Sequence, residues 1–239
     1  LVLLHAFPLD HRMWERQASL ADHLRLIVPD LRGFGGSGES LPESIAQLAD
    51  DTVALLDALH VEGPAVIAGI SMGGYVAQQI VARHPDRVAA AVLIDTKLEA
   101  DTPEARDSRR DLASKVGRLG QGILAEAMIP RLLGTSSEAR GLADRAEIES
   151  LLRRLILAQP VATIQAALAA LGDRPDMTGA MRQVRPPILL VVGAEDAITP
   201  PACLELAEEV IPHARLLIVP HAGHMTPLEQ PGIFNAAVL

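Results

Sequence analysis

The chain of 239 residues is long enough for one sizeable α/β domain with an inserted lobe. Its net charge of −9 argues against nucleic acids and anionic membrane surfaces as partners, and no apolar run approaches the ~20 residues that span a bilayer. Cys203 is the single cysteine, which excludes an internal disulfide and indicates a reducing compartment, so we expect a cytoplasmic protein. The chain starts on a strand-like run without an initiator Met, so we expect an incomplete N-terminus.

The first part of the chain alternates strand-like and helix-like segments. Short runs that are apolar throughout predict buried strands, and longer runs with apolar residues three or four apart predict helices. Strands are expected at 1–4, 26–28, 66–68 and 91–94, and helices at 14–23, 44–59 and 74–81. Because these strands are apolar on both faces, they predict a parallel sheet that helices cover on both sides.

The pattern changes between residues 98 and 181, where helical periodicity continues without a good strand. We interpret 98–181 as a helical cap inserted into an α/β core formed by 1–97 and 182–239. In the second core segment, strands are expected at 188–192 and 215–219, and helices at 201–211 and from about 228 to the end. The cap contains no Phe, Tyr or Trp. The pocket is therefore expected to be aliphatic, with Leu9, Met128 and Ile198 as candidate lining residues, and to favour short or medium aliphatic acyl groups.

The pentapeptide Gly69-Ile70-Ser71-Met72-Gly73 lies between a predicted strand and a predicted helix. This is the G-x-S-x-G pattern of a nucleophile elbow, a tight turn that exposes a serine beside the positive end of a helix. A glycine-rich turn that binds a phosphate or closes a loop is the alternative. The pattern indicates acyl transfer through a covalent ester on Ser71.

Such a serine needs a base, and His224 is the leading candidate because it follows the last predicted strand. Gly223 gives the chain freedom to turn this histidine inward. His221 is the competing residue in the same loop. The ordinary alternative for either histidine is a solvated loop position.

The base needs a carboxylate that fixes its tautomer and stabilises its charged form. Asp196 follows the strand at 188–192, at the sheet edge where parallel α/β sheets carry functional groups. Glu195 is a neighbour that we expect to be more exposed. Asp95, at the end of the strand at 91–94, is a serious alternative because it could reach the same histidine.

Two backbone N–H groups are the candidate donors for the oxyanion that develops during acyl transfer. One belongs to Met72, directly after the nucleophile, and the other to Phe7, in the loop after the first strand. We interpret His5 as a structural residue that holds this loop, not as a base. The glycine run at 33–38 is interpreted as a structural turn and not as a phosphate site, because no helix begins at its end. We expect neither a cofactor nor a metal.

Taken together, these segments resemble the α/β-hydrolase fold superfamily over essentially the whole chain. The motifs occur in the expected order: His5-Ala6-Phe7-Pro8, 30–37, 69–74, 84–88, 193–196 and Gly223-His224. The resemblance implies Ser71 as nucleophile, Asp196 as acid, His224 as base, and the N–H groups of Phe7 and Met72 as the oxyanion hole. Ala6 departs from the pattern, since relatives usually have Gly there.

Within the superfamily, the chain is most similar to small carboxylesterases and 3-oxoadipate enol-lactonase-like proteins. We therefore expect a cofactor-free serine hydrolase that cleaves a small-molecule ester or lactone through an acyl-enzyme. A lactonase of this type needs a group for a substrate carboxylate, and Arg131, Arg153 and Arg154 are candidates, with surface ion pairs as the ordinary alternative. A haloperoxidase or perhydrolase, and a slow ligand receptor on the same scaffold, are also compatible with these motifs. Enzymes with a carboxylate nucleophile are disfavoured, and the sequence does not predict the oligomeric state.

Overall fold

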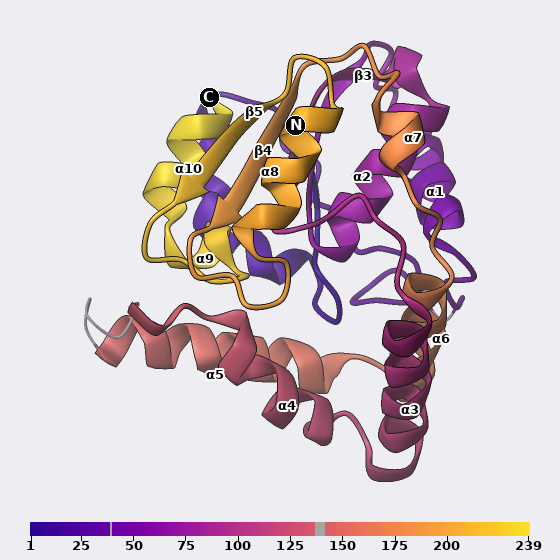
Figure 1. The fold of residues 1–239 in the computed structure, drawn as a ribbon, viewed down its shortest axis with the longest axis vertical. Helices are drawn as coiled ribbons and strands as arrows, with labels where there is room; N and C mark the ends of the chain where they lie inside the picture. The colour runs from indigo at the N-terminus through magenta and orange to yellow at the C-terminus, as the bar shows by residue number, and fades with distance from the viewer. Residues whose placement is uncertain (39, 137–141) are drawn as a thin grey trace.

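The sheet confirms the predicted fold class. In the computed structural model, which describes residues 1–38, 40–136 and 142–239, five parallel strands lie in the order β1-β2-β3-β4-β5. Their bounds are β1 (Val2–Leu4), β2 (Ala65–Ile70), β3 (Val88–Ile94), β4 (Ile188–Gly193) and β5 (Arg215–Val219). Because all five run in one direction, their carboxyl ends meet at one edge (Figure 1). Ser71 follows β2, Asp196 follows β4 and His224 follows β5, so all three lie at this edge.

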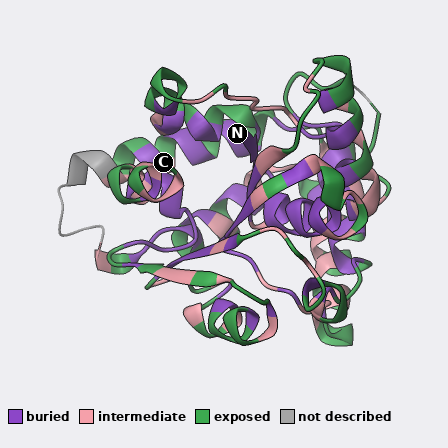
Figure 2. Ribbon diagram, turned by 90° about the horizontal axis from the view of Figure 1, so that it is seen from above, coloured by how far each residue is buried: buried purple, intermediate pink, exposed green. Residues whose placement is uncertain are grey.

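Helices flank the sheet, as the apolar strands predict. On the core they are η1 (His11–Asp22), α1 (Ile45–Ala58), α2 (Met72–Arg83), η2 (Pro85–Arg87), α7 (Thr178–Met181), α8 (Pro201–Val210), α9 (Thr226–Glu229) and α10 (Pro231–Val238). Helix α1 packs against α2, whereas η1 packs against α9 and α10. Figure 2 shows buried residues along the strands and the inner sides of the helices. The core therefore lies between the sheet and its covering helices.

Two predicted elements at the start of the chain differ from the structure. The segment at 26–28 forms a single bridge, between Val2 and Ile27, instead of a full strand. Pro29 follows directly and has no N–H to continue the pairing. The predicted helix at 14–23 is a 3₁₀ helix that begins three residues earlier, where the Asp10 side chain accepts a hydrogen bond from the Arg12 N–H. This side-chain cap determines where η1 starts.

Four further helices form a separate layer beyond the edge where the strands end. They are α3 (Pro103–Leu119), α4 (Gly122–Leu132), α5 (Leu142–Ala158) and α6 (Val161–Gly172). Figure 1 shows them together below the sheet, with α3 beside α6 and α4 beside α5. Helix α7, which falls inside the predicted cap, instead contacts α2 and α8 of the core. The chain has thus returned to the core before residue 181.

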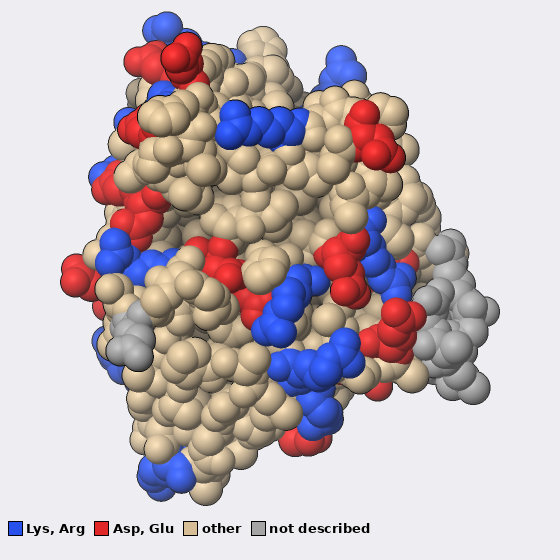
Figure 3. All heavy atoms as spheres, turned by 180° about the vertical axis from the view of Figure 1, so that it is seen from behind, with Lys and Arg blue, Asp and Glu red and all other residues tan. Residues whose placement is uncertain are grey.

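The surface carries charges of both signs. On the face in Figure 3, acidic and basic side chains lie beside one another over much of the molecule. Among the described residues, no single helix is long and apolar enough to cross a membrane. The segments 145–158 and 161–172 pass such a test only as a pair, and they are bent by 98°.

Candidate active site

Ser71 occupies a sharp turn between β2 and α2. Its φ of 52° and ψ of −111° lie outside the regions that ordinary residues prefer, a strain typical of functional sites. A side chain at Gly69 would collide with the carbonyl oxygen of Gly73, and one at Gly73 would collide with that of Leu4. The Ser71 N–H donates to the Ile94 carbonyl oxygen at 2.9 Å, which ties the turn to β3. The two glycines are therefore required by close backbone approach.

His224 and Asp196 form a buried pair at the ends of two neighbouring strands. His224 Nδ1 lies 2.7 Å from Asp196 Oδ2, and the two residues are 2% and 3% exposed. The other oxygen of Asp196 accepts the N–H groups of Ile198 and Thr199 at 2.7 and 2.9 Å, and the Thr199 hydroxyl donates to Oδ2 at 2.8 Å. This arrangement leaves the imidazole Nε2 available for another partner.

The charged forms of Asp196 and His224 stabilise each other. Burial by itself would raise the pKa of Asp196, but the hydrogen bond and charge of His224 and the two loop N–H groups outweigh it and lower that pKa below its ordinary value. Burial would likewise lower the pKa of His224, but Asp196 outweighs it through its hydrogen bond and charge, helped by Asp95 and Glu229, and the net pKa is raised. An ionised Asp196 beside a more basic imidazole is the arrangement a proton acceptor needs.

Asp95, the alternative acid, makes no hydrogen bond to the histidine ring. Its Oδ1 accepts the Gly193 N–H and the Thr226 hydroxyl at 3.0 Å each, and its Oδ2 accepts the Thr226 N–H at 3.1 Å. Burial, reinforced by the negative charge of Asp196, raises the pKa of Asp95 to about 7. Asp95 therefore joins the loop that carries Asp196 to the helix that follows His224.

The other competing residues face the cap. Glu195 accepts hydrogen bonds from Thr135 and Ser136, and His221 Nδ1 lies 3.0 Å from the Ser136 hydroxyl. His221 is exposed, whereas His224 is buried. The geometry therefore places His224, and not His221, against a carboxylate.

The loop after β1 presents a candidate oxyanion donor. His5 is fully buried, with Nδ1 3.0 Å from the Ala6 carbonyl oxygen and Nε2 accepting the Leu31 N–H at 3.0 Å. Burial lowers the pKa of His5, so it stays neutral and braces the loop. Among the described residues, neither the Phe7 nor the Met72 N–H donates to a protein acceptor. Both predicted donors thus remain available to a ligand.

The glycine run at 33–38 folds as a turn held by side chains of the protein. Asp30 Oδ2 accepts the Gly36 N–H at 2.7 Å, and Gln159 Oε1 accepts the Gly35 N–H at 3.1 Å. Because these loop donors are already used, the geometry fits a structural role.

A cavity of about 440 Å³ lies between the cap and the core loops that carry Phe7, Lys97 and Thr199. Phe7 and Thr199 line it from the core, and the predicted pocket residues Met128 and Ile198 also line it. Leu9 does not: the turn in which its N–H donates to the Ala6 carbonyl oxygen leaves Leu9 fully buried in the core. The lining is also less aliphatic than predicted, since it includes Tyr75, Lys97, Asp101, Arg109 and Arg131.

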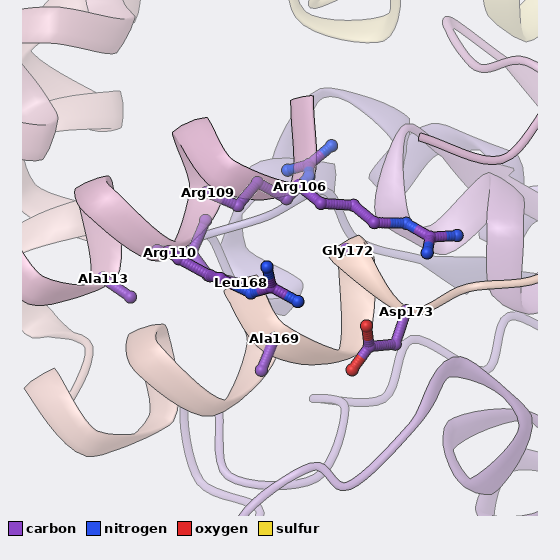
Figure 4. A pocket seen from close by; sticks show the side chains of 8 residues that line it. All are labelled: Arg106, Arg109, Arg110, Ala113, Leu168, Ala169, Gly172 and Asp173. Carbon is purple, nitrogen blue, oxygen red and sulfur yellow. The ribbon is translucent and has the colours of Figure 1, made fainter. Parts of the chain in front are cut away.

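A smaller cavity of about 80 Å³ lies between α3 and α6 (Figure 4). Arg106, Arg109 and Arg110 project from α3 around it, and Asp173 lies at the end of α6. Arg109 is paired with Asp101 and Arg110 with Asp107. The volume of this smaller cavity suits a few water molecules and not an ester substrate.

One cluster has the side chains of a metal site. Ligand atoms of Asp10, His11 and Asp30 lie within 4.8 Å of one another. However, Arg12 donates to both carboxylate oxygens of Asp10, at 2.9 and 2.7 Å, and His11 already bonds Asp30 at 2.7 Å. A guanidinium in this position opposes a cation, so internal ion pairing explains the cluster.

The cap contacts the loop that carries His224 directly, and the sequence did not predict this contact. The His224 N–H donates to the Leu132 carbonyl oxygen at 2.9 Å. Glu229 accepts the Gly223 N–H with one oxygen and the Gly134 N–H with the other, at 2.8 Å each. Glu229 and Gly134 are 95 residues apart, so no local pattern could have identified this bridge.

Comparison with known proteins finds relatives over nearly the whole chain. The sequence model of a family described as the alpha/beta hydrolase fold matches residues 1–231. The chain is 32% identical to a pimeloyl-[acyl-carrier protein] methyl ester esterase of Nitrosomonas europaea, over 98% of this chain and 92% of that protein. It is 29% identical to 3-oxoadipate enol-lactonase 2 of Acinetobacter baylyi, over 100% and 86%. The structure of a thermophilic esterase from Thermogutta terrifontis, with malate bound, matches with a TM-score of 0.94 and 39% identity, over 99% of this chain and 86% of that one.

Proposed function

Because the chain belongs to the alpha/beta hydrolase fold family, we propose that it is a serine hydrolase that cleaves small carboxylic esters or lactones. In this proposal Ser71 is the nucleophile, His224 the base and Asp196 the acid. The observation that carries it is the buried Asp196–His224 pair, at 2.7 Å, at the same sheet edge as the strained turn of Ser71. The esterase and enol-lactonase among the relatives support the substrate class.

The proposed reaction begins with proton transfer from Ser71 Oγ to His224 Nε2 as Oγ bonds to the substrate carbonyl carbon. The carbonyl oxygen becomes an oxyanion that the N–H groups of Phe7 and Met72 stabilise. The imidazolium, balanced by the charge of Asp196, then protonates the leaving alkoxide as the carbon–oxygen bond breaks. Water, activated by His224, hydrolyses the acyl-serine and releases the acid. In a lactone the leaving hydroxyl remains part of the acyl chain, so the last step releases a single hydroxy acid.

The test is hydrolysis of p-nitrophenyl butyrate by the protein and its Ser71→Ala variant. Removing the nucleophile is expected to lower kcat by roughly 10⁶-fold, to the level of the oxyanion hole alone. A fluorophosphonate probe should label the unaltered protein at Ser71, with the modified peptide identified by mass spectrometry. Undiminished turnover by Ser71→Ala would refute the proposal. Labelling without repeated turnover would instead favour a ligand receptor.

A further inference from the structure

The cavity beside the catalytic loops carries an excess of positive charge. Three cationic side chains line it, Lys97 after β3, Arg109 on α3 and Arg131 on the last turn of α4, against one carboxylate, Asp101. The chain as a whole has a net charge of −9. A local excess of the opposite sign therefore calls for an explanation at this site.

Asp101 is already matched by two guanidinium groups. Its side chain is 2% exposed and is paired with Arg109 Nε at 2.5 Å and with Arg174 Nη1 at 2.7 Å. Arg174 is itself buried and lies over the Tyr75 ring, 4.1 Å from its centroid. Lys97 Nζ is 4.0 Å from Asp101, at the margin of an ion pair. The charge of Lys97 is thus additional to a carboxylate that is already neutralised.

Arg131 has no partner of its own within the part of the chain that the structure describes: no ion pair or hydrogen bond joins its side chain to another described residue. The other two cap arginines considered from the sequence differ. Arg153 pairs with Glu126 at 2.6 Å, and Arg154 donates to the Ser150 hydroxyl at 2.8 Å. Of the three, only Arg131 lines the cavity of about 440 Å³.

Arg131 and Lys97 also lie close to the catalytic loops. Arg131 directly precedes Leu132, whose carbonyl oxygen accepts the His224 N–H at 2.9 Å. Lys97 follows Thr96, whose hydroxyl donates to the Ser71 carbonyl oxygen at 3.2 Å. Each of the two cations is therefore one residue away from a group that is hydrogen-bonded to Ser71 or to His224.

We propose that Lys97 and Arg131 form an anion subsite, and that the preferred substrates are esters or lactones that carry a second, ionised carboxylate. This inference rests on the proposed function, whose reacting serine places the other end of the substrate. Arg131 offers the guanidinium geometry that suits a carboxylate, and Lys97 adds a compact charge. Recognition of the free carboxylate involves no covalent step.

A matched pair of substrates tests the subsite. Monomethyl glutarate and dimethyl glutarate have the same carbon chain between their carbonyl groups and differ in the charged end. We expect kcat/KM to favour the monomethyl ester, chiefly through KM, and to lose this preference as salt screens the charges. Arg131→Gln and Lys97→Met should each reduce the preference about tenfold, since a charge-assisted hydrogen bond is lost. Arg153→Gln is the control that should leave it unchanged.

Binding of glutarate, measured by isothermal titration calorimetry, gives a readout independent of catalysis. Glutarate should bind more tightly than butyrate, and Arg131→Gln should weaken its binding about tenfold. Hydrolysis of p-nitrophenyl butyrate without any preference for monomethyl glutarate would overturn the subsite and leave the proposed function intact. An equal fall for both glutarate esters in Arg131→Gln would also overturn it, because this indicates a structural role. Glutarate binding by a protein that hydrolyses no ester would support the subsite and overturn the proposed function.

Discussion

Helix α2 of the core and helix α3 of the cap both border the candidate active site, but they differ in how far they are buried. Ten of the twelve residues of α2 are buried, whereas Val116 is the only fully buried residue among the seventeen of α3. Burial leaves a residue little freedom to move or to be replaced. The core therefore holds α2 rigidly, whereas the mostly exposed α3 carries charges that can vary with little effect on folding. We expect catalytic chemistry to depend on the core and substrate choice on the cap.

The largest loss of stability is expected from a methyl group added in the core turn. In Gly69→Ala, the new Cβ would collide with the Gly73 carbonyl oxygen and displace Ser71. We expect kcat to fall about 100-fold or more and stability to fall by about 3 kcal/mol. The cap control is Gly122→Ala, where a Cβ meets nothing within 4 Å and stability should hold or improve. The rate of ester hydrolysis and the Tm of thermal unfolding are measured for both variants. Equal changes of activity and stability in the two variants would refute the expected difference between the core and the cap.

The two buried carboxylates of the core should differ in importance. Asp196→Asn removes the charge that lies 2.7 Å from His224 Nδ1, and we expect kcat to fall by roughly 10³- to 10⁴-fold. Asp95→Asn alters a carboxylate that braces the surrounding loops, and we expect a loss of about tenfold. Steady-state kinetics on p-nitrophenyl butyrate distinguish the two. A larger loss in Asp95→Asn would make Asp95 the triad acid.

Glu229 joins the cap to the core, and a substitution at this residue shows how much the bridge contributes to activity. In Glu229→Gln one of the two acceptor oxygens becomes an NH2 donor that faces a backbone N–H, so one of the two hydrogen bonds is lost and we expect kcat to fall about tenfold.

The pH profile shows whether Glu229 also acts through charge. The negative charge of Glu229 helps to raise the pKa of His224, and His224 must be neutral to act as a base. The acid limb of kcat/KM should therefore lie above the ordinary histidine value in the unaltered protein. In Glu229→Gln it should move to lower pH. Glu209→Gln, at an exposed position, is the control. A fall in kcat with an unmoved acid limb would reduce Glu229 to a structural role.

The smallest effect concerns stability against pH. The pKa of Asp95 is raised to about 7 in the folded protein, against about 4 in the unfolded chain. Between these values the folded state binds a proton that the unfolded chain has released, so this group makes stability fall as pH rises. Asp95→Asn cannot titrate, and its Tm should decline less between pH 5 and 7. Parallel Tm curves for the two proteins would contradict the assignment.

Much of the fold could be predicted from the chain alone. The four longer strands and the helix after Ser71 have continuous apolar runs or helical spacing, and these signals lie within ten to fifteen residues. The strand expected at 26–28 does not form along its whole length. An apolar run does not show whether a neighbouring strand is available to pair with it, and Ile27 forms only a single bridge, to Val2.

The turn at 69–73 is the part that the sequence by itself determines, because its steric demands are met within five residues by Gly69 and Gly73. Tertiary structure decided which carboxylate meets His224, since Asp95 and Asp196 both follow strands and only one lies beside the ring. It also excluded Leu9 from the cavity, separated Arg131 from the other cap arginines, and joined Glu229 to the cap. Each of these depends on groups that packing brings together from distant parts of the chain. A local pattern can name a nucleophile, but only the assembled core and cap decide what surrounds it.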